Sequence, residues 1–298
     1  MASIVVLGSF NMDLVVTTDR LPSPGETVLG HGFHQGPGGK GSNQAIGARR
    51  LGADVAFVGA VGEDDFGAAA RRLYLREGIT SDGLATVPTP TGVALIVVDA
   101  EAENQIAVAS GANAEVSAGL VEQHEELIST ADVLLGQLET PIEAFVAAAR
   151  IARHGNTRVV LNPAPASDLP EEAWEHIDVV TPNQHELTAL TGIESPEWAA
   201  TALRNRGPVD VIVTRGPFGV TWTGEDGARR FPAVTVDAVD TTGAGDAFNA
   251  GLAVGLAETG RLEDGIGLGV RAGAFAVTAL GVLDGLATRR ELDERLPV

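Results

Sequence analysis

The sequence contains no cysteine, few aromatic residues and a single lysine, Lys40. Without cysteine there is no disulfide, no thiolate chemistry and no cysteine-based metal site. The 40 acidic residues against 20 basic ones give a formal charge of −20, which repels nucleic acid and anionic membranes. No run of about 18 apolar residues could span a membrane, and the N-terminal stretch does not resemble a signal peptide. We therefore expect a cytoplasmic protein that binds neither nucleic acid nor membrane.

Short apolar runs alternate with helix-like stretches along the 298 residues. The runs cover residues 4–10, 55–62, 131–138, 158–165, 178–183 and 210–216. Helix-like stretches cover residues 41–52, 66–78, 141–155 and 247–260. Nearly continuous apolar strands are typical of strands buried on both faces. The alternation predicts an α/β fold with a mostly parallel sheet flanked by helices.

Two segments depart from this alternation. Residues 13–36 contain turn residues and alternating polarity but no helical pattern, and residues 91–110 are typical of two strands around the polar turn "DAEAEN". We interpret them as one small β-sheet that serves as a lid, with ordinary edge hairpins as the alternative. No linker, repeat or low-complexity tract interrupts the chain, so we expect a single domain over residues 1–298.

The stretch "DAVDTTGAGDAFNAG", residues 237–251, places small residues directly before a helical pattern. Glycines allow backbone N–H groups to converge, and a helix start adds unpaired donors and positive dipole, so this segment predicts an anion hole. Asp246 lies in the first helical turn, where a carboxylate could act as a general base or as a simple N-cap. The chain has neither a Walker A motif nor a GxGxxG after a strand.

A second glycine-rich stretch, "GPGGKGSNQA", surrounds Lys40. We expect the glycines on both sides to let the backbone approach a ligand closely, with little room for a large side chain. An ammonium is a compact point charge, whereas a guanidinium is a broad planar fork.

Together these motifs resemble a known family. "DTTGAGDAFNAG" is similar to the C-terminal signature of the ribokinase-like (PfkB-type) carbohydrate kinases, and "GGKGSNQAIGARRLG" resembles their N-terminal signature. Further stretches, among them "GSFNMDLVV", "QLETP" and "TPNQHELTALTG", follow in the family's order from about residue 4 to about residue 281. The resemblance implies a ribokinase-like three-layer sandwich with a small β-sheet lid and ATP-dependent sugar phosphorylation.

From the resemblance we expect D-ribose to be phosphorylated at its primary 5-hydroxyl. A related kinase for deoxyribose, a nucleoside or another sugar is the first alternative. A catalytically dead sugar-binding regulator is the second alternative, although neither Asp246 nor the anion hole is damaged.

The resemblance also assigns roles to individual residues. Asp246 matches the catalytic base, which also contacts the sugar, and Gly243, Ala244 and Gly245 match the anion hole. The sugar-binding positions are Asn11, Asp13, Gly39, Lys40, Asn43 and Glu139. The ATP-binding positions are Asn183, Thr214, Arg215, Gly216, Gly219 and Gly245. Glu186 matches a position linked to magnesium through water, although an acid is also favourable in a first helical turn.

A monovalent cation, usually potassium, is a further implied cofactor. The matching positions are Asp240, Thr242, Ala276, Ala279, Gly281 and Gly285. The chain departs from the family at Asp284 and Gly285, where a hydroxyl that could help the cation is missing. It departs again at Val270, which can pack on the adenine but cannot hydrogen-bond to it. The resemblance also implies a homodimer formed through the lid sheet.

Overall fold

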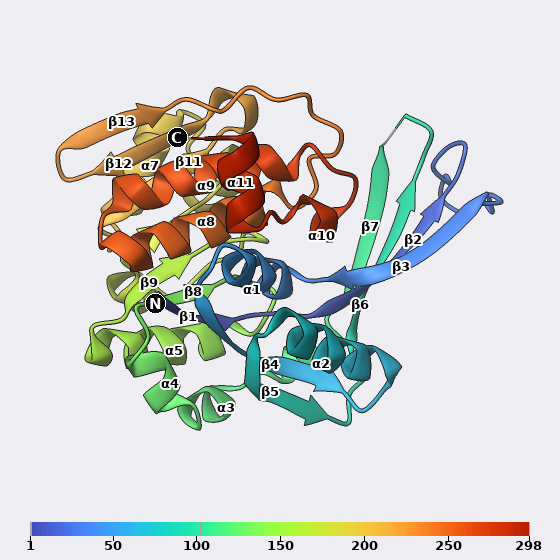
Figure 1. Ribbon diagram of the computed structural model, residues 1–298, viewed down its shortest axis with the longest axis horizontal. Coiled ribbons are helices and arrows are strands. Elements are labelled where there is room, and N and C mark those ends of the chain that lie inside the picture. Colours follow the sequence, from blue (N-terminus) through green and yellow to red (C-terminus); the bar gives the residue numbers. More distant parts are fainter. Residues whose placement is uncertain (1, 102, 298) are drawn as a thin grey trace.

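The computed structural model describes residues 2–101 and 103–297 and contains one large and one small β-sheet (Figure 1). The large sheet has nine strands in the order β13-β12-β11-β10-β9-β8-β1-β4-β5. These strands are β1 (Ser3–Leu7), β4 (Asp54–Gly62), β5 (Thr80–Val87), β8 (Val133–Gly136), β9 (Arg158–Leu161), β10 (Val179–Val180), β11 (Asp210–Thr214), β12 (Val220–Gly224) and β13 (Gly227–Phe231). Neighbouring strands pair in parallel, except that β12 pairs antiparallel with both β11 and β13.

Helices cover both faces of this sheet. One layer contains α1 (Lys40–Arg50), α2 (Asp65–Glu77), α8 (Ala244–Thr259), α9 (Leu262–Ala276), α10 (Val282–Gly285) and α11 (Arg289–Arg295). The other contains α3 (Ala118–Glu122), α4 (Glu125–Ser129), α5 (Ile142–Gly155), α6 (Gln184–Thr191) and α7 (Pro196–Arg204). In strand β1, Ile4 and Val6 pack into the first layer, and Val5 and Leu7 into the second. The predicted three-layer α/β arrangement with a mostly parallel sheet is confirmed.

Some strands differ from the prediction in length or number. The expected strand at residues 158–165 ends at Leu161, and that at 178–183 retains two residues. Both expected runs continue into polar loop residues that lie at the carboxyl end of the sheet. Strand β5 and the hairpin β12–β13 were not predicted.

The small sheet stands out from one end of the molecule, opposite the helices α5 and α7 in Figure 1. Its strands are β2 (Asn11–Thr17), β3 (Gly32–Gly38), β6 (Gly92–Val98) and β7 (Asn104–Ala109), in the order β3-β2-β6-β7. The central pair β2–β6 is parallel and both outer pairs are antiparallel. Both predicted lid segments therefore join one sheet. Residue Ala102 of the predicted turn, like Met1 and Val298, lies outside the described residues.

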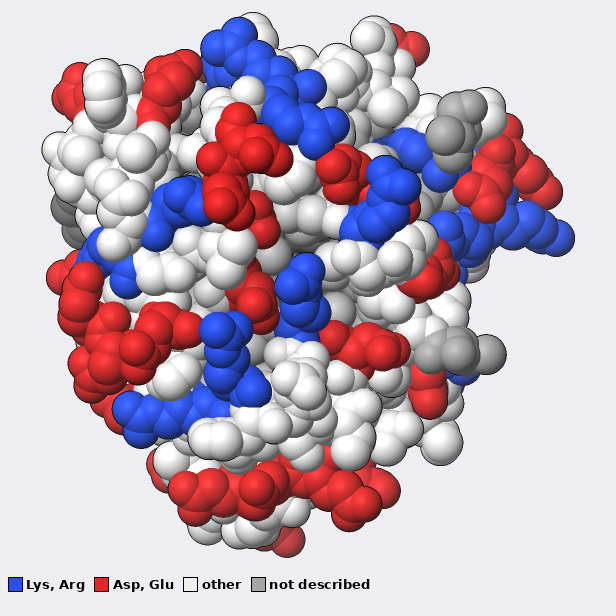
Figure 2. Space-filling model, turned by 90° about the vertical axis from the view of Figure 1, so that its left-hand side faces the viewer, with Lys and Arg blue, Asp and Glu red and all other residues white. Residues whose placement is uncertain are grey.

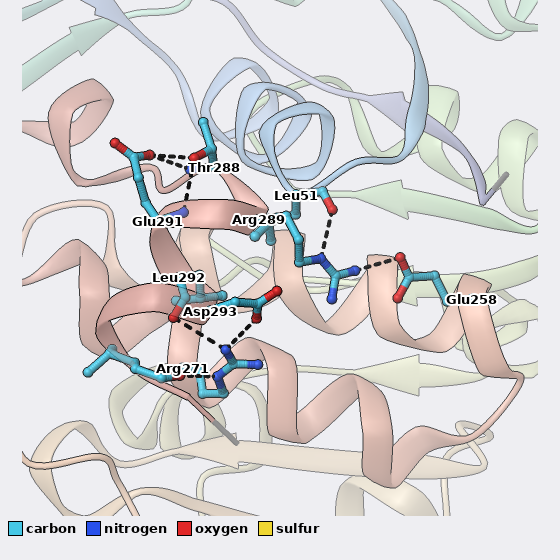
Figure 3. A network of polar contacts seen from close by, with 9 residues as sticks. Leu51, Glu258, Arg271, Thr288, Arg289, Glu291, Leu292 and Asp293 are labelled. Carbon is cyan, nitrogen blue, oxygen red and sulfur yellow. Dashed lines mark hydrogen bonds and ion pairs between the residues drawn. The ribbon is translucent and has the colours of Figure 1, made fainter.

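Arginines attach the C-terminal helix α11 to the layer beneath it (Figure 3). Arg271 on α9 is buried and donates to the carbonyls of Leu292 and Leu296 and to the Asp293 carboxylate at 2.6–3.3 Å. The Leu296 carbonyl lies at the C-cap of α11, where helix carbonyls lack partners within the helix, and Arg271 supplies a donor to it. Among the described residues, no helix has the length and apolarity needed to cross a membrane.

Candidate active site

Asp246 lies at the start of helix α8, and its side chain is buried. The N-cap of this helix is Gly243, whose φ of 77° is in the left-handed region that favours glycine. Asp246 does not cap the helix. Its Oδ2 accepts from Asn43 Nδ2 and its Oδ1 from Gln44 Nε2, each at 3.0 Å. Helix α1 thus holds the carboxylate of α8 in a fixed orientation.

The backbone beside Asp246 offers free donors. The Ala244 N–H makes a long hydrogen bond of 3.3 Å to the Thr241 carbonyl. Within residues 2–101 and 103–297, no hydrogen bond occupies the N–H groups of Gly245 and Asp246. Of the predicted anion-hole segment 243–245, Gly245 therefore presents the N–H that is available to an anion, together with the N–H of Asp246.

A polar cavity of about 250 Å³ opens in front of these groups. It is lined by Lys40, Asn162, Ala164, Thr181, Asn183, Glu186, Thr214, Gly243, Gly245, Asp246 and Asn249. Asn162, Thr181 and Thr214 lie at the carboxyl ends of β9, β10 and β11. The cavity thus occupies the edge of the sheet where ligands bind in open α/β folds.

A larger cavity of about 570 Å³ shares Thr214 and Gly245 with the first. Its walls are mainly apolar and include Phe248, Val270 and Val277. Gly216 and Gly219 line it as well, whereas Arg215 lines neither cavity and places its guanidinium 6.0 Å from the centre of the Phe218 ring. The two cavities form adjacent polar and apolar compartments that meet at the start of α8.

Of the predicted sugar-binding residues, Lys40 and Asp246 line the polar cavity, whereas Asn11, Asp13, Gly39, Asn43 and Glu139 are not among its lining residues. Asn11 begins β2, and its Oδ1 accepts from Asn113 Nδ2 at 2.8 Å. Asn113 is buried and also brackets the backbone of Phe10 with two hydrogen bonds of 3.0 Å. The sequence analysis missed Asn113, because an isolated asparagine in a turn carries no signal of its own.

Asp13 follows in the same strand. Burial raises the pKa of Asp13 to about 6, and the nearby carboxylates of Glu139 and Asp246 contribute to the rise. Three acidic residues from three separate segments, Asp13, Glu139 and Asp246, therefore lie near one another.

Glu139 has a structural contact in addition to its predicted role. Its Oε2 accepts from the backbone N–H of Lys40 at 2.9 Å and from the Ser9 hydroxyl. Helix α1 has Gly39 as its N-cap and no capping side chain of its own. Glu139 supplies that missing acceptor from the loop after β8, where its charge also favours the helix start.

Lys40 is the first residue of α1, and its side chain lines the polar cavity. Burial lowers the pKa of Lys40, but the carboxylates of Asp246, Glu139 and Glu186 outweigh burial, so its pKa lies above the ordinary value. The ammonium therefore stays charged at neutral pH and is held among three anions.

The glycines beside Lys40 approach the chain itself and not the cavity. A Cβ at Gly39, whose φ is 90°, would meet the Asn11 nitrogen at 2.8 Å, and one at Gly41 would meet the Ser9 nitrogen at 2.6 Å. Our expectation that these glycines let the backbone approach a ligand stays a prediction, and the close contacts give the glycines a structural role as well. They let α1 begin directly against the turn that joins β1 to β2.

Asn183 and Glu186 form a capping box at the start of α6. The Asn183 N–H donates to Glu186 Oε2 at 2.8 Å, and the Glu186 N–H donates to Asn183 Oδ1 at 2.9 Å. Both residues also line the polar cavity. Burial raises the pKa of Glu186, although the backbone N–H and Lys40 act in the opposite direction. The capping role that we gave as an alternative for Glu186 is confirmed.

The predicted cation positions lie on two adjoining loops beside α8. Asp240 accepts from the N–H groups of Thr242 and Gly281, each at 2.9 Å. A Cβ at Gly285 would meet the Ala276 carbonyl oxygen at 2.7 Å. A hydrogen bond thus joins Asp240 to Gly281, and Gly285 lies in close contact with Ala276. Within the described residues, no group of three or more His, Asp or Glu side chains forms a metal-binding cluster.

Residues 1–289 match the pfkB family of carbohydrate kinases. This chain belongs to that family. It is similar to the ribokinase of Haemophilus influenzae, with 40% identity over 99% of this chain and 98% of that protein. The crystal structure of ribokinase from Thermotoga maritima aligns with a TM-score of 0.92 at 36% identity, over 99% of each chain. The structure of Arabidopsis thaliana ribokinase complexed with ribose and ATP aligns with a TM-score of 0.92 at 28% identity, over 99% of this chain and 98% of that one.

Part of the predicted set lines the two cavities and divides between them. Those that line the polar cavity are Lys40, Asn183, Glu186, Thr214, Gly243, Gly245 and Asp246, and those that line the apolar one are Thr214, Gly216, Gly219, Ala244 and Gly245. The sequence analysis gave no role to Gln44, Asn162, Thr181 or Asn249. Such buried amides and hydroxyls can be recognised only from the hydrogen bonds that they form in the folded protein.

Proposed function

We propose that this carbohydrate kinase transfers the γ-phosphoryl group of ATP to the primary 5-hydroxyl of D-ribose. The observation that carries the proposal is the position of Asp246. Its buried carboxylate lies where a polar cavity meets an apolar one, beside the free N–H of Gly245. Full-length similarity to ribokinases supports ribose as the sugar, and the relative solved with ribose and ATP supports this pair of substrates.

The polar cavity would hold the sugar. Hydroxyl groups both donate and accept, so a polyol needs carboxylates and amides in fixed geometry. Asn11, Asp13, Asn43, Lys40 and Glu139 supply these groups, and Asn113 and Ser9 fix two of them. The apolar cavity would take the adenine by packing, with Val270 in its wall.

In the chemical step, the 5-oxygen forms a bond to the γ-phosphorus, and the bond from that phosphorus to the β,γ-bridging oxygen breaks. The hydroxyl proton passes to Asp246, and ADP leaves with the bridging oxygen. The N–H groups of Gly245 and Asp246 hold the oxygens of the moving phosphoryl group, as donors fixed in advance at a helix start. The products are ribose 5-phosphate and ADP.

We include magnesium and potassium as cofactors because the chain has residues that could bind them. Magnesium usually retains waters and binds phosphates, so Glu186 at the cavity wall is a sufficient protein contact through water. A potassium ion suits Asp240 together with carbonyl oxygens of the two adjoining loops, from Thr242, Ala276, Ala279, Gly281 and Gly285. When bound, the cations would neutralise phosphate charge and support the backbone of the anion hole.

The small sheet would act as a lid over the sugar, excluding the water that could otherwise accept the phosphoryl group. Asn11 and Asp13 belong to its strand β2, so movement of the lid would complete the sugar site. We include a homodimer through this sheet in the proposal, and all of these elements would act as one domain. A cytoplasmic location stays a prediction.

A coupled ADP-release assay tests the proposal with ribose, deoxyribose, adenosine and fructose 6-phosphate as acceptors. We expect the highest kcat/KM with ribose, and phosphorus NMR should identify ribose 5-phosphate. A higher kcat/KM with another acceptor would reject ribose as the substrate. No turnover with any of them would favour the sugar-binding regulator.

The substitution Asp246→Asn tests the base in the same assay. Loss of a general base lowers turnover by about 10²–10⁴-fold, whereas ribose binding measured by calorimetry should change only a few-fold. Asp264→Asn is the matched control, because Asp264 also lies in the first turn of a helix but lines neither cavity. Turnover of Asp246→Asn equal to that of the control would remove Asp246 from its role.

A further inference from the structure

Gln44 is fully buried, and its amide is the centre of a chain of polar contacts that reaches Asp246. Its Nε2 donates to Asp246 Oδ1 at 3.0 Å and to Asn162 Oδ1 at 3.1 Å. Its Oε1 accepts from Gln137 Nε2 at 2.6 Å. Every polar atom of this side chain therefore has a partner, although no charged group other than Asp246 is among them.

The chemistry of its neighbours determines which way the Gln44 amide faces. An ionised carboxylate can only accept, so the side of Gln44 that faces Asp246 must be the NH₂ group. Asn162 points the same way, because its own Nδ2 donates to the Thr181 carbonyl at 3.2 Å and leaves its oxygen toward Gln44. The opposite orientation of Gln44 would set its oxygen against two acceptors.

Gln44 and Asn43 together engage both oxygens of the Asp246 carboxylate. They are consecutive residues of α1, and each contributes one N–H donor at 3.0 Å. A carboxylate oxygen has two lone-pair sites, so each oxygen retains one that can accept a proton. Two donors from one rigid helix fix the plane of the carboxylate.

We propose that Gln44 is a positioning residue, which holds the Asp246 carboxylate in a fixed orientation, aimed at the cavity. The proposal rests on the function proposed above, in which Asp246 takes the proton of the sugar hydroxyl. Gln44 itself does not line either cavity and would act only through Asp246. An orienting partner for the base is a recurrent requirement in catalysis that activates a hydroxyl.

The substitution Gln44→Glu provides a test that preserves size and shape. It replaces the donor with a second carboxyl group beside Asp246, so the two share a proton and the ionised form of the pair is disfavoured. The charged groups nearby, Lys40, Asp13, Glu139 and Glu186, stay the same. We expect kcat at neutral pH to fall on the order of 10²-fold, with KM for ribose and ATP within about threefold of wild type. The acid limb of the pH–kcat profile should move upward by about one pH unit or more.

Gln44→Leu removes the donor without adding charge and should lower kcat with a smaller displacement of the acid limb. Ser42→Ala is the matched control, because Ser42 is equally buried on the same helix and, within the described residues, its hydroxyl has no hydrogen-bond partner. We expect its pH profile to superimpose on that of the wild type. Thermal unfolding and ribose calorimetry on all variants separate a kinetic effect from a loss of folding.

The proposal is overturned if Gln44→Glu keeps the wild-type kcat and acid limb. It is also overturned if activity in every Gln44 variant falls only in proportion to the folded fraction. Neither result is confused with failure of the proposed function, because in that case the wild-type protein itself would not phosphorylate ribose.

Discussion

At the scale of single residues, Lys40 concentrates the positive charge of the site at one atom. Its side chain lines the polar cavity at the start of α1, under the influence of the carboxylates of Asp246, Glu139 and Glu186. A compact ammonium can lie among three anions and still reach a phosphate oxygen, whereas a guanidinium needs a planar space and a longer reach. The only lysine in a chain with 19 arginines thus stands where the two side chains differ most.

The substitution Lys40→Arg should therefore lower kcat/KM for both ribose and ATP, by about tenfold or more. Steady-state kinetics with each substrate varied in turn provide the measurement. Arg49→Lys is the control, since Arg49 on the same helix bonds to the carbonyls of Gly78 and Ala53, away from the cavity. Wild-type kinetics in Lys40→Arg would mean that the site does not require lysine in preference to arginine at this position.

Asp13, to which we assign a role in sugar binding, is unfavourable for the stability of the folded protein when it is ionised. Its pKa is about 6 in the folded protein, against an ordinary value of 3.8, because of burial and then of Glu139 and Asp246. As pH rises, the unfolded chain loses this proton first, so the folded state loses stability between these two values and does not regain it at higher pH. At neutral pH the ionised Asp13 thus lowers the stability of the folded protein.

We therefore expect Asp13→Asn to raise the free energy of unfolding at neutral pH by about 1–2 kcal/mol, after allowance for partial exposure. The gain should shrink toward zero at about pH 3 and below, where the carboxyl is largely neutral in both states. The same variant should bind ribose more weakly. Denaturant unfolding at the two pH values and calorimetry with ribose test both halves, and an equal gain at both pH values would contradict the electrostatic cause.

Sequence alone identified the residues whose neighbours in the chain are distinctive. Asp246 follows a glycine-rich segment before a helix, and Lys40 is the only lysine between glycines, so both could be predicted. Gln44 and Asn113 could not, because their function depends on partners about 200 and 100 residues away. For Lys40, sequence alone did not show that its glycines make room for the turn after β1.

At the scale of elements, strands that are apolar on both faces were predictable, and those at the margins of the sheet were not. β1 and β4 lie between two helical layers and consist of nearly continuous apolar residues. The edge strands β5 and β13 contain polar and exposed residues, such as Asp82, Arg229 and Arg230, so their sequences lack that pattern. Pairing with a neighbouring strand, and not burial, determines their conformation.

The loop that contains Gly285 is constrained on two sides. The Ala276 carbonyl leaves no room for a Cβ at Gly285. Arg50 donates to the carbonyls of Leu283 and Leu286 at 2.6 and 2.9 Å and pairs with Glu77 at 2.9 Å. Gly285, where the hydroxyl is missing, is therefore tightly packed. A side chain at this position would require the segment to move.

With one ligand group fewer, we expect potassium to activate this enzyme less than a ribokinase with a hydroxyl at that position. Turnover should rise by no more than about threefold when potassium replaces a large organic cation at constant ionic strength. The comparison at constant ionic strength removes screening effects on the acidic surface. A steep, saturable dependence on potassium would show that backbone carbonyls alone form a strong site.

At the scale of the whole molecule, the negative charge is spread over the surface while the cavity keeps its own cation. Figure 2 shows acidic side chains in broad patches on one face, with arginines between them. Several arginines pair with these acids, as Arg229 does with Glu263 and Arg206 with Glu171, each at 2.8 Å. The site can therefore receive an anionic nucleotide only because its helix starts and Lys40 provide a local positive field.

The lid sheet, in contrast to the charged surface described above, exposes large apolar side chains. Ile106 and Val108 of the edge strand β7 expose 56% and 54% of their residue area. By the strand register, Val108 lies opposite Ala94, which in turn lies opposite Asp13, so Val108 and Ile106 share the face of Asp13, whereas Leu95 pairs with Leu14 and lies on the other face. Exposed apolar side chains on an edge strand are suited to contact with a second copy of the lid.

We expect the wild-type protein to be a dimer and the double substitution Ile106→Lys and Val108→Lys to make it monomeric. Two charges on each partner would repel and could not be buried without partners in an apolar contact. Light scattering after gel filtration gives the molecular mass, and Gln105→Lys on the opposite face of β7 is the matched control. Because the altered face continues to Asp13, the monomer should also bind ribose more weakly. A wild-type protein that is monomeric at assay concentrations, or a double variant that stays dimeric, would contradict assembly through this face.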